Sequence, residues 1–321
     1  MHTKDFTDLS ETSSADVQAI LDTAVYLKRR RARGITEQAL AGKTLAMIFE
    51  KPSLRTRVSF ESGMSELGGR AMYLSRDEVG LGSREAVQDI ARVLSRYVHG
   101  IMIRTFAHAN VRDLSQYATV PVINGLSDLS HPCQAMADLL TILEHRGRLA
   151  GQTVVFIGDG NNVARSLAQA CVLVKARFVL ACPQAYAFDA ATIADFGPAW
   201  GSDVSQCHDP ATAVAGADIL YSDVWTSMGQ EAERAERLAA FAGYQINANL
   251  LAAAGGAAQI MHCLPAKRGE EITDEAVESP ASIVFDQAEN RMHAQKAILR
   301  LLLADDRDAV LTAAAGAAGL D

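Results

Sequence analysis

The chain has 321 residues, 49% of them hydrophobic and 21% charged, which is enough for two ordinary globular domains or one large α/β unit. Its net charge of −8 comes without a sustained basic face and argues against a nucleic-acid partner. The polar start over residues 1–5 and the lack of any run of ~20 apolar residues favour a cytoplasmic protein without a membrane partner.

Short apolar runs alternate with amphipathic segments, a pattern typical of repeated βα units around parallel sheets. The strands predicted in the first part of the chain are 44–49, 70–75, 101–106 and 120–124. Those predicted in the second part are 153–158, 177–182, 219–223, 260–264 and 283–286. A helix is predicted over 86–97, where Ile90, Val93, Leu94 and Tyr97 share one face. The sequence therefore predicts an α/β fold.

Two long helical patterns suggest how the chain divides into domains. The pattern over 135–149 ends before Gly151 and a new strand, as expected of a domain connection. The pattern over 290–304 is expected to return to the first domain. We therefore expect one domain over 1–134, completed by 290–321, and a second over 135–289. The Ala/Gly-rich tail after residue 308 is expected to be a frayed end.

The segment Phe49–Arg57 follows a predicted strand and opens a helical pattern over 58–67. A helix N-terminus offers unpaired N–H groups and the positive end of a dipole, both of which suit a phosphate. Ser53 and Thr56 add hydroxyl donors, and Arg55 adds a planar fork that matches phosphate oxygens. An ordinary capped helix start, with Ser53 as the N-cap and the arginines solvated, explains the segment equally well. The segment alone does not decide between the two.

The segment Phe49–Arg57 resembles the phosphate-binding motif of the transcarbamoylases. Further strings resemble the same family in the same order, and these are Ile103-Arg104-Thr105, His131-Pro132-Cys133-Gln134, Asp223-Val224-Trp225-Thr226-Ser227-Met228-Gly229, His262-Cys263-Leu264-Pro265 and Glu289-Asn290-Arg291. The resemblance extends from about residue 6 to residue 301. It implies two parallel-sheet αβα domains linked by helices, one binding carbamoyl phosphate and the other an amino acid.

The resemblance implies a set of carbamoyl phosphate ligands. They are Ser53, Leu54, Arg55, Thr56, Arg104, His131, Gln134, Cys263, Leu264 and Arg291. Arg104 ends a predicted strand, where open α/β sheets place ligands, although a lone arginine there is usually solvated. His131 and Gln134 would donate hydrogen bonds to the carbamoyl oxygen and stabilise the oxyanion that forms on attack. The alternatives are a plain polar residue for His131 and a small buried residue for Cys133.

The resemblance also implies an ornithine site. Its residues are Asn162, Asp223, Ser227 and Met228. Asp223 would hold the amino groups, and Cys263 would lie against the reacting amine. The catalytic residues so implied are Arg104, His131, Gln134, Asp223, Cys263 and Arg291. The simpler alternatives are a helix cap for Asp223, a plain turn for the residues after it, and a buried strand residue for Cys263.

The choice of acceptor depends on two of these strings. Aspartate carbamoyltransferases carry proline where Cys263 stands, and they lack the Ser227-Met228-Gly229 string. A cationic acceptor also needs an acidic neighbour such as Asp223. The resemblance therefore favours ornithine over aspartate, putrescine or N-acylornithine. A non-catalytic paralogue that binds carbamoyl phosphate stays as the alternative from another class.

No cofactor is expected. The five cysteines form no CxxC pair and predict neither a metal site nor a disulfide framework. The string Gly158–Val163 lies where a dinucleotide fingerprint would, but Val163 replaces its third glycine. The resemblance implies a homotrimer or a multiple of trimers. Two positions depart from the family: Leu54 stands where threonine is usual, and Gly80 where many relatives carry a glutamine that reaches a neighbouring subunit's phosphate site.

Overall fold

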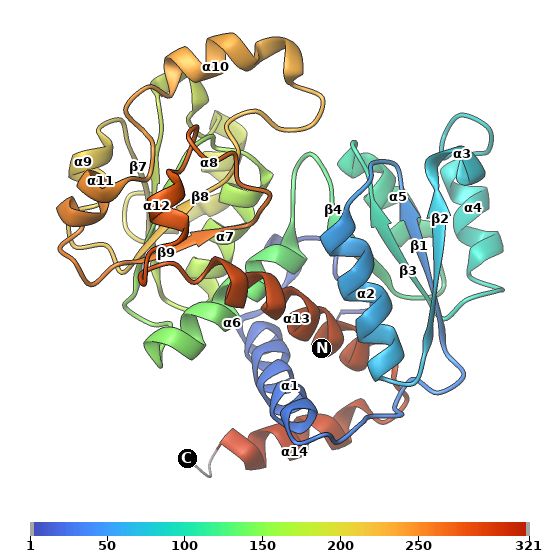
Figure 1. The fold of residues 1–321 in the computed structure, drawn as a ribbon. Coiled ribbons are helices and arrows are strands. Elements are labelled where there is room, and N and C mark those ends of the chain that lie inside the picture. The colour runs from blue at the N-terminus through green and yellow to red at the C-terminus, as the bar shows by residue number, and fades with distance from the viewer. Residues whose placement is uncertain (1–2, 319–321) are drawn as a thin grey trace. The chain divides into compact units, whose positions relative to one another are not determined.

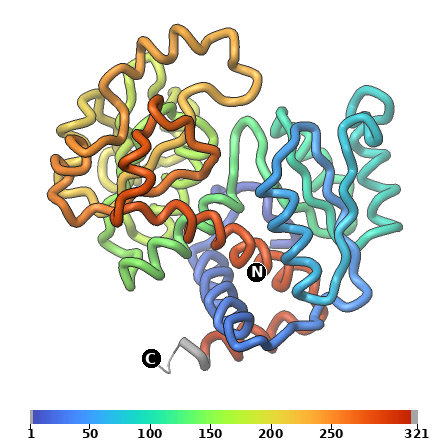
Figure 2. The backbone as a smooth tube through the Cα atoms, in the orientation of Figure 1, coloured from blue at the N-terminus to red at the C-terminus, as the bar shows by residue number. Residues whose placement is uncertain are grey.

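The computed structural model describes residues 3–318 and divides into two compact units. The first comprises residues 1–140 and 289–321, and the second comprises residues 141–288. Residues 1–2 of the polar start and 319–321 of the expected C-terminal segment lie outside the described part. The chain can be followed from one terminus to the other in Figure 2.

The first unit contains a parallel sheet and the helices that cover it (Figure 1). Its elements are η1 (Leu9–Glu11), α1 (Ser14–Ala32), β1 (Thr44–Phe49), α2 (Leu54–Glu66), β2 (Arg70–Ser75), α3 (Arg76–Val79), α4 (Val87–Leu94), β3 (Gly100–Arg104), α5 (His108–Tyr117), β4 (Val122–Leu126), the start of α6 (Pro132–Arg146), most of α13 (Val284–Leu303) and α14 (Arg307–Ala318). The strand order is β2-β1-β3-β4, and all pairs are parallel. The chain first moves from β1 to β2 and then returns to the other side of β1, which makes the carboxyl ends of β1 and β3 a topological switch point.

Successive side chains along each strand point to opposite faces of this sheet, and helices cover both faces. Ala46 and Ile48 of β1 pack with Ile90 of α4 and Leu114 of α5, which identifies the helices on one face. On the other face α2 and α13 come close together: a Cβ added at Gly63 would lie 3.2 Å from Lys296. Strands buried on both faces are expected of a parallel sheet between helices.

The second unit contains a five-stranded parallel sheet in the order β7-β6-β5-β8-β9. Its elements are β5 (Thr153–Ile157), α7 (Asn162–Leu173), β6 (Arg177–Ala181), η2 (Gln184–Tyr186), α8 (Ala190–Phe196), η3 (Gly197–Ala199), β7 (Val204–Cys207), α9 (Pro210–Ala213), β8 (Ile219–Ser222), η4 (Glu231–Glu233), α10 (Arg234–Ala240), α11 (Ala248–Ala253), β9 (Gln259–His262) and α12 (Asp274–Val277). Here the switch point lies between β5 and β8. The Ser222 hydroxyl donates to the carbonyl of Ile157 at 2.7 Å and ties these two strand ends together.

The α/β class with two parallel sheets is confirmed, whereas two local predictions are wrong and one strand was missed. Residues 284–286 belong to helix α13 instead of a strand. The strand β7 (Val204–Cys207) was not predicted. Residues 309–318 of the expected frayed end belong to helix α14, which packs beside α1 (Figure 1).

Candidate active site

The N-terminus of α2 lies directly after β1, at the switch point of the first sheet. Ser53 is its N-cap: the hydroxyl accepts from the Thr56 N–H at 3.4 Å and donates to the Thr56 hydroxyl at 3.1 Å. The two interpretations of this segment, a capped helix start and a phosphate site, predict the same geometry, because a capped first turn also presents N–H groups to an anion. Leu54 is 75% exposed, and as the first residue of α2 its backbone N–H has no acceptor within the helix.

Arg291 connects this helix start to the start of α6. Its two Nη atoms donate to Gln134 Oε1 at 2.7 Å and to the Thr56 hydroxyl at 3.1 Å. The Gln134 amide in turn donates to Asp138 at 2.8 Å. The structure therefore brings together three residues that lie far apart in the sequence, Thr56, Gln134 and Arg291.

Arg104 ends β3 as the register partner of Phe49, and its side chain is buried. Lys51 lies close by, with its amine 4.6 Å from the centroid of the Phe106 ring. Burial, reinforced by the charge of Arg104, lowers the pKa of Lys51 to about 8. This acidic protein thus concentrates positive charge at the switch point. Lys51 was not among the predicted ligands.

His131 is buried next to these cations. Burial lowers its pKa well below the usual value, and the charges of Arg291 and Arg104 lower it further. The imidazole is therefore neutral near pH 7 and can donate a hydrogen bond without carrying a charge, as electrophilic histidines do. The neighbouring Cys133 is a buried thiol whose pKa burial raises to about 12, in agreement with a small packed residue.

In the second unit, Asp223 follows β8 at the switch point and accepts three hydrogen bonds. The donors are the Val224 N–H at 2.8 Å, the Cys263 thiol at 3.0 Å and the Asn161 amide at 3.1 Å. Asn161 is also the N-cap of α7, whereas the predicted ligand Asn162 is the first residue of that helix. Asn161, which contacts Asp223, was not among the predicted ligands.

The loop that follows Asp223 carries the other two predicted acceptor ligands. The Ser227 N–H donates to Gln230 at 3.0 Å, and the Met228 side chain is half exposed. Gly229 has φ +94°, a left-handed conformation that favours glycine. We call residues 223–229 the acceptor loop.

Cys263 and Leu264 follow β9, and a buried pair of side chains holds their backbone. His262 Nδ1 accepts from the Leu264 N–H at 2.9 Å, so the ring proton is on Nε2, which donates to Glu271 at 3.0 Å. Leu264 has φ 56°, which is costly for a branched side chain. The His262–Glu271 pair offsets this cost by satisfying the Leu264 N–H.

Gly80 is required by its own turn. It caps α3 with φ +59°, and a Cβ added there would lie 2.6 Å from the Cβ of Arg84. A glutamine at this position would need a rearranged turn. The departure from the family therefore concerns the backbone as well as the lost side chain.

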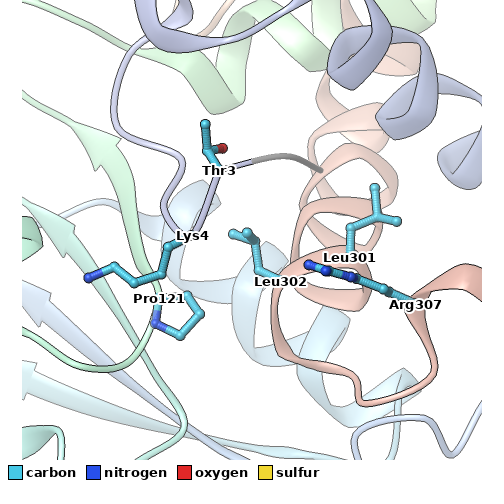
Figure 3. A pocket seen from close by; sticks show the side chains of 6 residues that line it. All are labelled: Thr3, Lys4, Pro121, Leu301, Leu302 and Arg307. Carbon is cyan, nitrogen blue, oxygen red and sulfur yellow. The ribbon is translucent and has the colours of Figure 1, made fainter.

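A cavity of about 330 Å³ lies elsewhere in the first unit (Figure 3). Its lining residues are Thr3, Lys4, Pro121, Leu301, Leu302 and Arg307. Pro121 precedes β4, so the cavity is at the amino ends of the strands, whereas ligands of open α/β sheets bind at the carboxyl ends. The Lys4 amine donates to the carbonyls of Ser115 and Ala118. We do not assign the activity to this cavity.

Within residues 3–318, no helix is long and apolar enough to cross a membrane. The same residues contain no group of three or more His, Cys, Asp and Glu side chains suited to a metal ion.

One parallel-sheet unit gathers cationic side chains beside a neutral histidine, and the other holds a carboxylate that accepts a hydrogen bond from a thiol, an arrangement suited to acyl-group transfer to an amine. Residues 4–144 match the carbamoyl-P binding domain of aspartate/ornithine carbamoyltransferase, and residues 150–302 match its Asp/Orn binding domain. The chain therefore belongs to the aspartate/ornithine carbamoyltransferase family.

The similar proteins include chains from plants, archaea and bacteria. The chloroplastic ornithine carbamoyltransferase of Pisum sativum is 52% identical over 92% of this chain and 79% of its own. A Pyrococcus furiosus relative named "Ornithine carbamoyltransferase, anabolic" is 50% identical over 94% of this chain and 96% of its own. The solved ornithine carbamoyltransferase of that organism has a TM-score of 0.89 at 50% identity, covering 93% of this chain and 96% of its own. The Thermus thermophilus structure has a TM-score of 0.86 at 45% identity, covering 94% and 100%.

Proposed function

We propose that this protein transfers the carbamoyl group of carbamoyl phosphate to the side-chain amine of L-ornithine, giving L-citrulline and phosphate without a cofactor. The observation that carries the proposal is the buried Asp223 carboxylate, which contacts both Cys263 and Asn161. An acidic group of this kind suits an amine acceptor and would repel aspartate. The names of the similar proteins support the same acceptor.

The first domain, 1–134 with the returning C-terminal segment, would bind carbamoyl phosphate. Its phosphate would lie at the start of α2, on the N–H groups of that turn and the side chains of Ser53, Arg55 and Thr56. Its carbonyl oxygen would accept from Arg104, His131 and Gln134, the donors that stabilise the oxyanion. Arg291, which already bonds Thr56 and Gln134, would hold both ends of this site in place.

The second domain, 135–289, would bind ornithine. Asn162 and the acceptor loop residues Ser227 and Met228 would contact its α-amino acid end. Asp223 and Cys263 would orient the side-chain amine, and Leu264 would contact carbamoyl phosphate. A free alkyl amine has a pKa near ~10.4, so the amine must lose a proton before or during attack.

In the reaction, the amine nitrogen forms a bond to the carbamoyl carbon. The carbon–oxygen bond to phosphate then breaks, and phosphate leaves with the electron pair and takes up the second proton that the amine releases, the first having passed to solvent before attack. No covalent intermediate with the enzyme is needed. Holding the two substrates together is worth ~7–11 kcal/mol in well-oriented reactions, so positioning would supply much of the acceleration.

A substrate panel tests this proposal against its alternatives. The enzyme is given carbamoyl phosphate with ornithine, putrescine, N-acetylornithine or aspartate, and each carbamoylated product is measured. We expect citrulline to form fastest. Faster product from another acceptor would reassign the substrate, and binding of carbamoyl phosphate without any product would indicate a non-catalytic paralogue.

We further propose a cytoplasmic homotrimer or multiple of trimers that works in arginine biosynthesis. Apolar side chains exposed on α2 (Leu54, Val58) and on the edge strand β2 (Met72) support a subunit interface on the first unit. The relative named anabolic supports the biosynthetic direction. Light scattering coupled to gel filtration should give three times the mass of one chain or a multiple of it; a monomer would overturn the assembly.

A further inference from the structure

Arg237 on α10 is a buried arginine that bonds two separate segments of the acceptor side. Its Nη1 donates to the Asp159 carboxylate at 2.6 Å and to the carbonyl oxygen of Trp225 at 3.1 Å. Its Nε donates to Glu233 at 2.8 Å, and its guanidinium lies 4.9 Å from the centroid of the Tyr186 ring. The planar fork of an arginine can make these contacts at once, which a lysine cannot.

Both segments contain residues of the acceptor cluster. Trp225 belongs to the acceptor loop and follows Asp223 by two residues. Asp159 lies in the turn between β5 and α7, and Asn161, two residues later, donates to Asp223 at 3.1 Å. Arg237 therefore joins the two segments that carry Asn161 and Asp223, through residues two positions away from each.

The charge of Arg237 also matters to this turn. Burial raises the pKa of Asp159, and Arg237 opposes that effect while the charge of Asp223 reinforces it. The carboxylates of Asp159 and Asp223 thus lie near each other. The Arg237 guanidinium bonds Asp159, whereas Asp223 accepts from the Cys263 thiol. Without Arg237, the partly buried Asp159 carboxylate would lose its cationic partner, and the turn would be expected to shift.

We propose that Arg237 is a positioning residue for the acceptor: it fixes the acceptor loop against the 158–161 turn and thereby orients Asp223 toward the substrate amine. This inference rests on the proposed function. An ion pair with a merely structural role would stabilise the unit without affecting one substrate more than the other.

Steady-state kinetics with each substrate varied in turn separate the two roles. We expect Arg237→Gln to raise the KM for ornithine at least about tenfold, with kcat and the KM for carbamoyl phosphate changed less than about threefold. Arg237→Lys keeps the charge and should recover part of the loss. Arg234→Gln is the matched control, because Arg234 lies on the same helix but is exposed and pairs with Glu270. It should behave as wild type.

Asp159→Asn tests the same Arg237–Asp159 contact from its other partner. If Arg237 acts through Asp159, the double variant with Arg237→Gln should be no worse than Arg237→Gln alone. Should Arg237→Gln fail to fold, Arg237→Lys and Asp159→Asn give the KM comparison. A wild-type KM for ornithine in these variants, or equal changes in both KM values, would overturn the inference. A wild-type enzyme that makes no citrulline would instead overturn the proposed function.

Discussion

The Asp223 carboxylate lies among donors of three kinds, a backbone N–H, a thiol and an amide, so its orientation is well determined. Asp223→Asn keeps the shape but removes the negative charge. Because hydrogen bonds to charged groups are worth about 1.5–3 kcal/mol, kcat/KM for ornithine should fall about 10- to 100-fold. The KM for carbamoyl phosphate should stay unchanged. Asp195→Asn, at an exposed carboxylate of the same unit, is the control. Wild-type ornithine kinetics in Asp223→Asn would remove Asp223 from the site.

If carbamoyl phosphate binds beside Lys51, as proposed, its binding should depend on pH. Its pKa of about 8 means that the amine is cationic at pH 7 and mostly neutral at pH 9. The affinity for the anionic substrate should therefore fall as the pH rises through 8. In Lys51→Arg the side chain stays charged, so this fall should disappear. Binding measured from pH 7 to pH 9 checks the prediction, which is wrong if both proteins show the same dependence.

Side-chain direction limited what the sequence could say about single residues. The resemblance named Asn162 as an acceptor ligand, and the neighbouring Asn161, whose amide donates to Asp223, was missed. If a helix begins one residue earlier or later, the side chains of its first turn point in different directions. Motif spacing alone does not determine the first residue of the helix. Lys51 lacks a distinctive pattern as well: its low pKa arises from burial and from Arg104, and folding alone brings these about.

The start of α2 has a stabilising N-cap and is the proposed phosphate site, and substitutions at Ser53 can separate the two roles. Ser53→Ala should cost about 1 kcal/mol of stability, the usual value for a lost N-cap, and weaken carbamoyl phosphate binding. Ser53→Asp should keep the cap but repel the phosphate, so it should melt near wild type and bind no carbamoyl phosphate. Ser13→Ala removes the N-cap of α1 and serves as a control for stability alone. Carbamoyl phosphate binding by Ser53→Asp would contradict the assignment of this helix start.

Most strands of the two sheets could be predicted from the sequence, and each element that was mispredicted or missed has a physical reason. Residues 283–286 contain a short apolar run, and such a run fits a strand or one turn of a helix equally well. The strand β7 at the sheet edge is only partly buried, so its sequence lacks a continuous apolar run. The tail after residue 308 is rich in alanine, a strong helix former, and packs beside α1. Tertiary packing thus decided what composition left open.

At the scale of the molecule, each unit has its own sheet and core, and their titrating groups differ. Burial lowers the pKa of two histidines of the first unit, His131 and His293. A histidine that binds its proton less tightly when folded contributes stability that is full above its unfolded pKa of ~6.5 and is lost as the pH falls below it. In the second unit, burial raises the pKa of Asp159. The contribution of this carboxyl to folding stability therefore has the opposite pH dependence and increases as the pH falls.

Acidification from pH 7.5 to pH 5.5 should therefore destabilise the first unit selectively. Each buried histidine contributes at most about 1.4 kcal/mol per pH unit to this loss, because the unfolded chain takes up one more proton than the folded one. Hydrogen exchange at the two pH values, compared at equal intrinsic rates, should show protection lost in β1 and β3 and kept in β5 and β8. His293→Gln should flatten the slope in the first unit by up to one proton. Equal losses in both units, or an unchanged slope in His293→Gln, would contradict the assignment of acid sensitivity to these histidines.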